Sequence, residues 1–128
     1  MAKKSAKILI VEDEPFLLEL YQTKLVQEGY NALVASNGDV GFAQALNNLP
    51  DLILLDLLMP KVDGYEMLKK LKADSKTKAI PVIIFSNLTQ KEEIEKGLRL
   101  GANDFIIKTS ITPTQLASRV KGFLQNKK

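Results

Sequence analysis

Residues 51–60 read Asp-Leu-Ile-Leu-Leu-Asp-Leu-Leu-Met-Pro, and the aspartate at position 56 interrupts a run of apolar side chains. The run Leu52–Leu55 has the length of a β-strand, and its continuity is typical of a strand that is covered on both faces. An ionised carboxylate beside such a strand costs free energy unless it is hydrogen-bonded, paired or bound to a metal. The stretch therefore predicts a buried strand that carries Asp56 into a functional site. The alternative is that Asp56 only begins the turn that Gly64 completes.

Similar short apolar runs recur on both sides of this stretch, at Ile8–Val11, Ala32–Ala35, Val82–Phe85 and Phe105–Ile107. The segments between the runs have apolar residues at helical spacing. Strands that alternate with helices predict an α/β fold, a doubly wound parallel sheet with helices on both faces. No internal repeat or linker is visible in the sequence. We therefore expect one domain over residues 1–128, with a core from about residue 7 to residue 125 and a basic tail at each end.

Local signals mark where the helices begin and end. Pro15 suits the first position of a helix. Two pairs have the capping-box pattern, Thr89 with Glu92 and Thr112 with Gln115, and each predicts a helix start. Glycines at positions such as 29 and 101 predict helix ends.

The chain has no Cys and no His. The missing thiols exclude disulfides, thiolate zinc sites and cysteine nucleophiles, and the missing imidazoles exclude serine–histidine catalysis. Any chemistry must use carboxylates, hydroxyls, lysines, backbone groups or a hard cation.

The formal net charge of +3 comes from the two ends of the chain, which carry Lys3, Lys4, Lys7, Lys121, Lys127 and Lys128. Without these six lysines, twelve basic side chains face fifteen acidic ones. The internal lysine cluster at residues 69–78 has no arginines or interleaved aromatic residues, so direct nucleic-acid binding is not expected. No apolar run has the length of a membrane span, and the start of the chain lacks a signal-peptide core. We expect a cytoplasmic protein without membrane contact.

Polar residues that can take part in catalysis or metal binding follow four of the predicted strands. In a doubly wound sheet, ligands bind beyond the carboxyl ends of the strands. The residues that these ends bring toward one another are Glu12, Asp13, Asp56, Ser86 and Lys108. Each has an ordinary structural explanation when taken singly; the acidic residues before Pro15, for example, can cap a helix. Together they predict a site.

Carboxylates that crowd together repel one another, and an oxygen-bound divalent cation relieves the repulsion. With no thiolate or imidazole present, Mg²⁺ is the cation that the remaining ligands favour. A carboxylate can act as a nucleophile and form an aspartyl phosphate. A transferred phosphoryl group needs compensating positive charge and hydrogen-bond donors. The hypothesis is that Asp56 is the nucleophile, Glu12 and Asp13 bind the metal, and Lys108 and Ser86 contact the phosphoryl group.

The sequence resembles the receiver domains of bacterial response regulators, in particular single-domain receivers of the chemotaxis-regulator type. The resemblance runs from about Lys7 to the last helix. It rests on four motifs in order: Ile8-Leu-Ile-Val-Glu12-Asp13, Asp56-Leu-Leu-Met-Pro60-Lys-Val-Asp63-Gly64, Val82-Ile-Ile-Phe-Ser86 and Gly101-Ala-Asn-Asp-Phe105-Ile-Ile-Lys108.

The resemblance implies a flavodoxin-like fold with strand order 2-1-3-4-5. It implies that Asp56 accepts a phosphoryl group from a histidine kinase or a histidine phosphotransfer protein, and that the domain catalyses its own phosphorylation and dephosphorylation. Asp13, Asp56 and the backbone carbonyl of Leu58 would bind Mg²⁺ directly, and Glu12 through water. Ser86 and Phe105 would form the conformational switch, with the output surface on the fourth helix, fifth strand and fifth helix. The downstream protein target is not identified by the sequence.

Several positions depart from the usual pattern of this family. Thr109 replaces a proline that follows a cis peptide bond, and a cis bond before a residue other than proline costs about 3–4 kcal/mol, so the Lys108–Thr109 bond is predicted to be trans. Asn87 replaces a small residue; its amide either narrows access to Asp56 or donates a hydrogen bond to the phosphoryl group. Leu58 and Leu88 stand where polar residues are common, and our hypothesis is that they hinder attack by water and prolong the life of the aspartyl phosphate.

Three other kinds of protein remain as alternatives. A pseudo-receiver would be an interaction module that is never phosphorylated; Thr109 and Asn87 are compatible with it, whereas the complete acidic and basic set argues against it. A hydrolase of the haloacid dehalogenase type needs a second acid two residues after its nucleophile, where this chain has Leu58. A flavodoxin-like cofactor binder needs a glycine-rich phosphate loop, which this sequence lacks.

Overall fold

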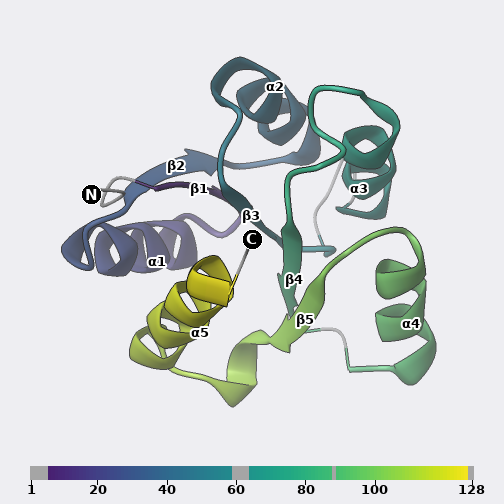
Figure 1. Ribbon diagram of the computed structural model, residues 1–128. Coiled ribbons are helices and arrows are strands. Elements are labelled where there is room, and N and C mark those ends of the chain that lie inside the picture. The colour runs from purple at the N-terminus through teal and green to yellow at the C-terminus, as the bar shows by residue number, and fades with distance from the viewer. Residues whose placement is uncertain (1–5, 59–63, 88, 127–128) are drawn as a thin grey trace.

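The computed structural model describes residues 6–58, 64–87 and 89–126. Within these residues strands and helices alternate along the whole chain (Figure 1). The elements are β1 (Lys7–Val11), α1 (Pro15–Gln27), β2 (Asn31–Ala35), α2 (Gly38–Asn48), β3 (Leu52–Leu55), α3 (Gly64–Ala73), β4 (Val82–Ser86), α4 (Lys91–Arg99), β5 (Asp104–Ile107), a short 3₁₀ helix (Lys108–Ser110) and α5 (Pro113–Asn126).

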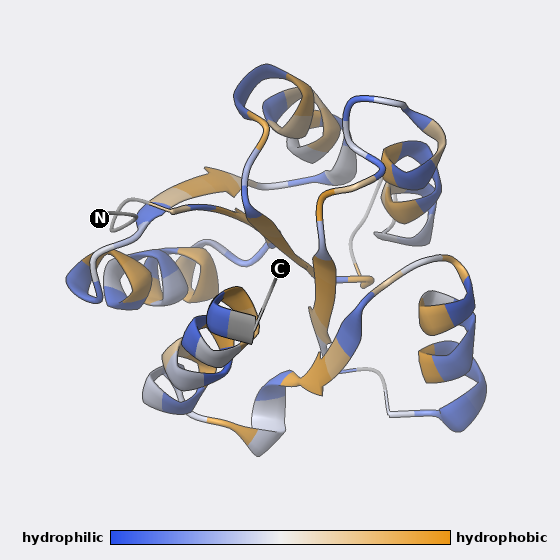
Figure 2. Cartoon of the chain, in the orientation of Figure 1, coloured by the Kyte–Doolittle hydropathy of each residue, from blue (hydrophilic) through white to orange (hydrophobic). Residues whose placement is uncertain are grey.

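The strands form one parallel sheet in the order β2-β1-β3-β4-β5. This confirms the predicted α/β architecture and the strand order. The strands are the most apolar parts of the ribbon, whereas each helix has polar and apolar faces (Figure 2). That difference is expected when a sheet is covered on both sides and each helix is covered on one.

Alternate residues of the strands feed two separate apolar layers. On one face Leu9, Ile53 and Ile84 pack with residues of α2 and α3, and Phe105 packs against the same layer. On the other face residues of β1, β3, β4 and β5 pack with α1 and α5, which lie side by side in Figure 1. Because both faces are buried, every strand has a fixed register, and the residue at which each strand ends is fixed as well.

The predicted helix boundaries are confirmed in most places. Pro15 is the first residue of α1. At α5, the Gln115 side chain accepts a hydrogen bond from Thr112 N–H, and the Thr112 hydroxyl accepts one from Gln115 N–H, which is the predicted capping box. Gly29 and Gly101 follow the ends of α1 and α4 with φ angles of 97° and 117°, which favour glycine.

The capping box predicted for Thr89 is wrong. Helix α4 begins at Lys91, its N-cap is Gln90, and no side chain caps it. Thr89 lies one residue too early to reach the first free N–H groups of the helix.

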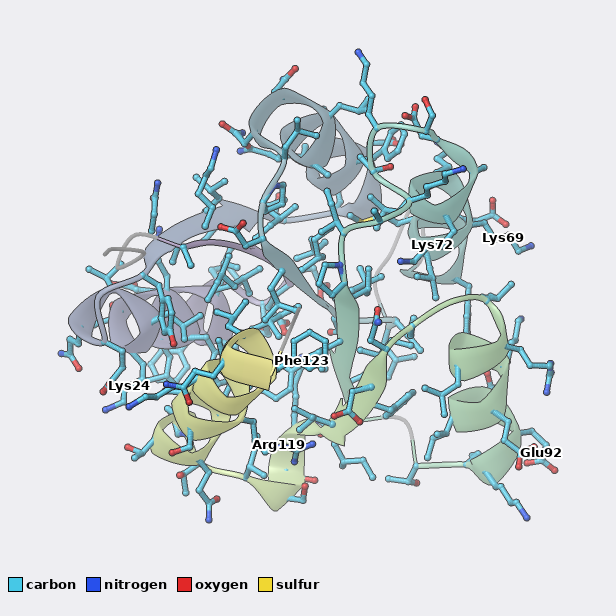
Figure 3. All side chains as sticks on the ribbon, viewed as in Figure 1. Lys24, Lys69, Lys72, Glu92, Arg119 and Phe123 are labelled. Atoms are coloured by element: carbon cyan, nitrogen blue, oxygen red, sulfur yellow. The ribbon has the colours of Figure 1, made fainter. Side chains whose placement is uncertain are left out.

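Charged side chains mark the outer surface of the molecule. Lys69 extends from α3 away from the body of the protein, and Arg119 reaches from α5 to the Asp104 carboxylate of β5 at 2.9 Å (Figure 3). None of the helices in residues 6–58, 64–87 and 89–126 combines the length and apolar character needed to cross a bilayer.

Candidate functional site

The carboxyl ends of β1, β3, β4 and β5 bring the predicted residues to one edge of the sheet. Glu12 follows β1 and Asp56 follows β3, and the backbone at both positions still takes part in the sheet hydrogen bonding. Glu12 N–H donates to Ala35 O at 3.0 Å, and Asp56 N–H donates to Val11 O at 3.1 Å. The two carboxylates are therefore attached to a rigid part of the fold.

A buried ion-pair network joins three of these residues. The Lys108 ammonium donates to Asp56 Oδ2 at 2.9 Å and to Glu12 Oε1. Glu12, Asp56 and Lys108 are only 3%, 5% and 8% exposed, respectively. A buried charge is stable only when it is paired and hydrogen-bonded. Each carboxylate therefore depends on Lys108, and Lys108 depends on both carboxylates.

The network changes how readily its members ionise. Burial raises the pKa of Glu12 above its ordinary value of 4.5, and the hydrogen bond from Lys108 opposes that rise without cancelling it. For Lys108 burial favours the neutral amine, but the hydrogen bonds to Glu12 and Asp56 outweigh burial and raise the pKa of the ammonium. The ammonium is accordingly held in its charged form, ready to meet an anion.

Three carboxylates at this edge have the chemistry of a hard-cation site. Glu12, Asp13 and Asp56 each offer an oxygen within 4.8 Å of the others, and Asp13 is the least buried of the three. Their charge exceeds that of the one ammonium bound among them. An all-oxygen set with one accessible member fits Mg²⁺, which keeps several waters and binds few carboxylates.

The backbone after Asp56 is held close to the carboxylate. Leu58 N–H donates to Asp56 Oδ1 at 3.1 Å, so both Asp56 oxygens have hydrogen-bond partners. From the sequence we expected the Leu58 carbonyl to bind the metal and the Leu58 side chain to hinder water, and we did not predict this role of its N–H. The sequence contains a signal for the tight packing here, since Gly64 lies against the backbone: a Cβ on it would be 2.5 Å from the carbonyl oxygen of Asp56.

Ser86 and Phe105 lie on adjacent strands. Ser86 is 0% exposed, and its hydroxyl oxygen has no hydrogen-bond partner among the described residues. Its register partner on β5 is Ile107, two residues after Phe105. The Phe105 ring is partly buried against the layer that α2 and α3 cover. An unpartnered buried hydroxyl is uncommon, and it suits a group that binds only part of the time.

Two of the positions that depart from the family pattern, Asn87 and Thr109, are in contact. Asn87 Oδ1 accepts a hydrogen bond of 3.0 Å from Thr109 N–H. The described chain has no cis peptide bond, which confirms the prediction for Lys108–Thr109. Sequence reasoning considered Asn87 and Thr109 separately and did not predict this bond. Leu88, which we predicted to limit access to Asp56, lies outside the described residues, and the Leu58 side chain is 54% exposed.

Comparison with known proteins supports one family along nearly all of the chain. The sequence profile of the response regulator receiver domain matches residues 8–121. Response regulator PleD of Caulobacter vibrioides is 38% identical over 123 residues, which are 96% of this chain and 27% of PleD. The DNA-binding dual master transcriptional regulator RpaA of Synechocystis is 37% identical over 119 residues, 93% of this chain and 49% of that protein. The chain thus spans between about a quarter and a half of these curated relatives.

Solved structures have the same architecture over most of their length. The chemotaxis protein CheY4 of Vibrio cholerae superposes with a TM-score of 0.86 at 26% identity, covering 92% of this chain and 98% of CheY4. The signal receiver domain of a signal transduction histidine kinase from Syntrophus aciditrophicus gives a TM-score of 0.85 at 36% identity, covering 97% of this chain and 93% of that domain. With the profile match, the strand order and the acidic edge of the sheet all in agreement, the chain belongs to the response regulator receiver domains of two-component signalling.

Proposed function

We propose that this chain is a single receiver domain in which Asp56 accepts a phosphoryl group from a phosphohistidine of a histidine kinase or phosphotransfer protein. The observation that carries the proposal is the Lys108 ammonium, buried between Asp56 and Glu12 at the edge of the sheet with Asp13 in reach. An ordinary structural ion pair needs one carboxylate for one ammonium. This site holds an excess of carboxylates, as expected where a cation and a phosphoryl group are both to be bound.

In the proposed step an Asp56 carboxylate oxygen attacks phosphorus. The new oxygen–phosphorus bond forms as the donor's nitrogen–phosphorus bond breaks, and the departing imidazole of the donor takes a proton from solvent. These 128 residues contain no histidine, so none of them supplies the phosphohistidine. Asp56 Oδ2 now accepts from Lys108, and this ammonium can follow the charge onto the phosphoryl oxygens.

Mg²⁺, when bound, would neutralise charge on the phosphoryl oxygens and on the carboxylates. In our proposal Asp13, Asp56 and the Leu58 carbonyl would hold the ion directly, and Glu12 would hold it through water. Glu12 also accepts hydrogen bonds from Lys108 Nζ and, at 3.1 Å, from Glu14 N–H. These bonds hold its carboxylate at the site in the absence of phosphate.

The same proposal gives Ser86 and Phe105 their roles. The buried Ser86 hydroxyl lacks a partner among the described residues, and a phosphoryl oxygen on Asp56 would supply one. Movement of Ser86 toward that oxygen vacates space on the Phe105 side of the sheet. The resulting change in the positions of Ser86 and Phe105 would alter the surface formed by α4, β5 and α5, and a downstream protein would bind to that surface.

An assay with a small phosphodonor tests the proposal without knowledge of the kinase. The protein is incubated with acetyl phosphate and Mg²⁺ and its intact mass is followed, in parallel with Asp56→Asn and with a sample containing EDTA. We expect an added mass of one phosphoryl group on the wild type and none on either control.

The other outcomes distinguish the alternatives. No adduct under any condition would contradict the proposal and favour the pseudo-receiver. Release of many equivalents of phosphate, with no lasting adduct, would instead indicate a hydrolase. An adduct that forms equally on Asp56→Asn would place the chemistry elsewhere in the chain.

A further inference from the structure

A hydrogen bond joins the segments that follow β4 and β5, directly after the two side chains proposed to contact the phosphoryl group. Ser86 is the last residue of β4 and pairs in register with Ile107, the last residue of β5. Beyond this pair the two chains leave the sheet, and Asn87 Oδ1 accepts from Thr109 N–H at 3.0 Å. Asn87 directly follows Ser86, and Thr109 directly follows Lys108. The bond therefore ties the backbone beside one functional side chain to the backbone beside the other.

The Thr109 amide is a group that needs such a partner. Residues Lys108–Ser110 form a single 3₁₀ turn, and no side chain caps it at Ile107. The first N–H groups of any helical turn have no acceptor within the turn itself. Asn87 supplies the missing acceptor from the neighbouring strand end, and so fixes the start of the turn.

The start of this turn sets the position of Lys108. The Lys108 side chain extends from the turn to Asp56 and Glu12, and the residue is only 8% exposed. A lysine side chain has many rotamers, and their number falls when the backbone that carries it is held. A turn that is free to move leaves Lys108 Nζ with more positions in which it does not donate to Asp56 Oδ2, the contact of 2.9 Å seen here.

We propose that Asn87 is a positioning residue for Lys108, which it holds at Asp56 through the Thr109 amide. This inference rests on the proposed phosphorylation of Asp56. It differs from the two roles that the sequence left open for Asn87, which were to screen Asp56 or to donate to the phosphoryl group. Those roles act directly at Asp56, whereas this one requires the N–H of Thr109.

The hydrogen bond can be measured in the unphosphorylated protein. Amide hydrogen exchange at Thr109 is followed by NMR in the wild type, Asn87→Ala, Asn87→Asp and Thr109→Ala. We expect slow exchange in the wild type and faster exchange in Asn87→Ala. Asn87→Asp retains the acceptor oxygen and Thr109→Ala retains the N–H, so both should stay protected. Equal exchange in wild type and Asn87→Ala would overturn the inference, whether or not Asp56 is ever phosphorylated.

The effect on the reaction is tested by a double-mutant cycle. The rate of Asp56 phosphorylation by acetyl phosphate with Mg²⁺ is compared in wild type, Asn87→Ala, Lys108→Met and the double variant. Methionine keeps much of the volume of the lysine side chain and removes the ammonium. We expect Asn87→Ala to slow the wild type by about two- to fivefold, the effect of one exposed hydrogen bond. In the Lys108→Met background, which has no ammonium to position, we expect Asn87→Ala to have no further effect.

The cycle separates the inference from its alternatives. If Asn87→Ala changes the rate by the same factor in both backgrounds, Asn87 acts at Asp56 directly and the inference is wrong. If the wild type is not phosphorylated at all, the proposed function fails, and the exchange measurement still decides whether the bond holds the turn. Unfolding of each variant by urea checks that a change of rate does not reflect loss of the fold.

Discussion

At the scale of single residues, the site holds more negative charge than its one ammonium balances. Glu12, Asp13 and Asp56 offer oxygens within 4.8 Å of one another, and Lys108 bonds to two of them. Asp13 makes no ion pair with the described residues. Binding sites that await a ligand commonly carry such a cost in stability.

Replacing Asp13 should therefore stabilise the domain while damaging its metal site. For Asp13→Asn we expect the free energy of unfolding without Mg²⁺ to rise by about 1 kcal/mol, because repulsion among the carboxylates is relieved. Mg²⁺ affinity, measured by calorimetric titration, should fall about tenfold or more.

The matched control for this change is Glu95→Gln, which removes one charge from an exposed position in the middle of α4, away from the ends of the helix. It should leave both quantities near the wild-type values. Equal stabilisation by Glu95→Gln would show that net charge, and not local repulsion, is the cause.

Glu12 gives the stability a defined pH dependence. Its pKa is raised by burial above the ordinary 4.5, so the folded protein holds this proton more tightly than the unfolded chain does. The stabilisation from protonated Glu12 is present below about pH 4.5 and is lost as the pH rises through the folded pKa. Glu12→Gln resembles the protonated form and does not titrate. In urea unfolding without Mg²⁺, the wild type should therefore lose stability relative to Glu12→Gln as the pH rises from about 4.5 toward neutrality. Parallel curves would contradict this explanation.

Leu58 bears on the lifetime of the aspartyl phosphate. Its N–H donates a hydrogen bond to Asp56, and the residue, with its apolar side chain, is 54% exposed. Replacing Leu58 and Leu88 by Asn should speed the decay of phospho-Asp56 severalfold, because polar side chains can orient an attacking water. Decay is followed by loss of the phosphoryl mass after the donor is removed. An unchanged rate in the double variant would refute the hypothesis.

At the scale of elements, the start of α3 is packed against the backbone that carries Asp56. A Cβ on Gly64 would lie 2.5 Å from both the Asp56 carbonyl oxygen and Leu57 Cα, and neither can move without shifting β3 or its loop. Helix α4 is anchored differently. Gly97 is the one buried residue of α4. The Tyr65 hydroxyl of α3 donates a hydrogen bond of 2.5 Å to the Glu93 carboxylate of α4.

Two glycine substitutions test the importance of this close packing. Gly64→Ala should lower the free energy of unfolding by about 1–3 kcal/mol, because the added methyl group meets backbone that cannot give way. Gly122→Ala places a methyl group on α5 with nothing within 4 Å, and should stabilise by about 0.5–1 kcal/mol through helix propensity. Urea unfolding measures both. Stabilisation by both changes would show that α3 does not approach Asp56 as closely as described.

At the scale of the whole molecule, the sequence predicts the sheet well because both faces are buried. Continuous apolar runs such as Leu52–Leu55 and Val82–Phe85 match β3 and β4 to within one residue. The rule that ligands bind beyond the carboxyl ends of parallel strands then brings Glu12 and Lys108 together, and the structure has them in contact.

The features that the sequence did not predict depend on short-range geometry between loops. The bond from Thr109 N–H to Asn87 joins residues 22 positions apart, and no local pattern specifies it. Thr89 was expected to cap α4, but the helix begins at Lys91, and a shift of one residue removes a hydroxyl from capping distance. A strand is predicted from the hydropathy of several consecutive residues. A hydrogen bond between two loops, or a helix cap, depends instead on the positions of single atoms.

The central claim is that Asp56 itself carries the phosphoryl group. Borohydride reduces an aspartyl phosphate to homoserine, with release of phosphate, and leaves a free carboxylate unchanged. After treatment with acetyl phosphate and Mg²⁺, reduction and proteolysis, mass spectrometry of the peptides locates the reduced residue. We predict homoserine at position 56 and at no other aspartate. Homoserine at position 13 or at another aspartate, or an unreduced Asp56 in protein that has gained phosphoryl mass, would contradict the account.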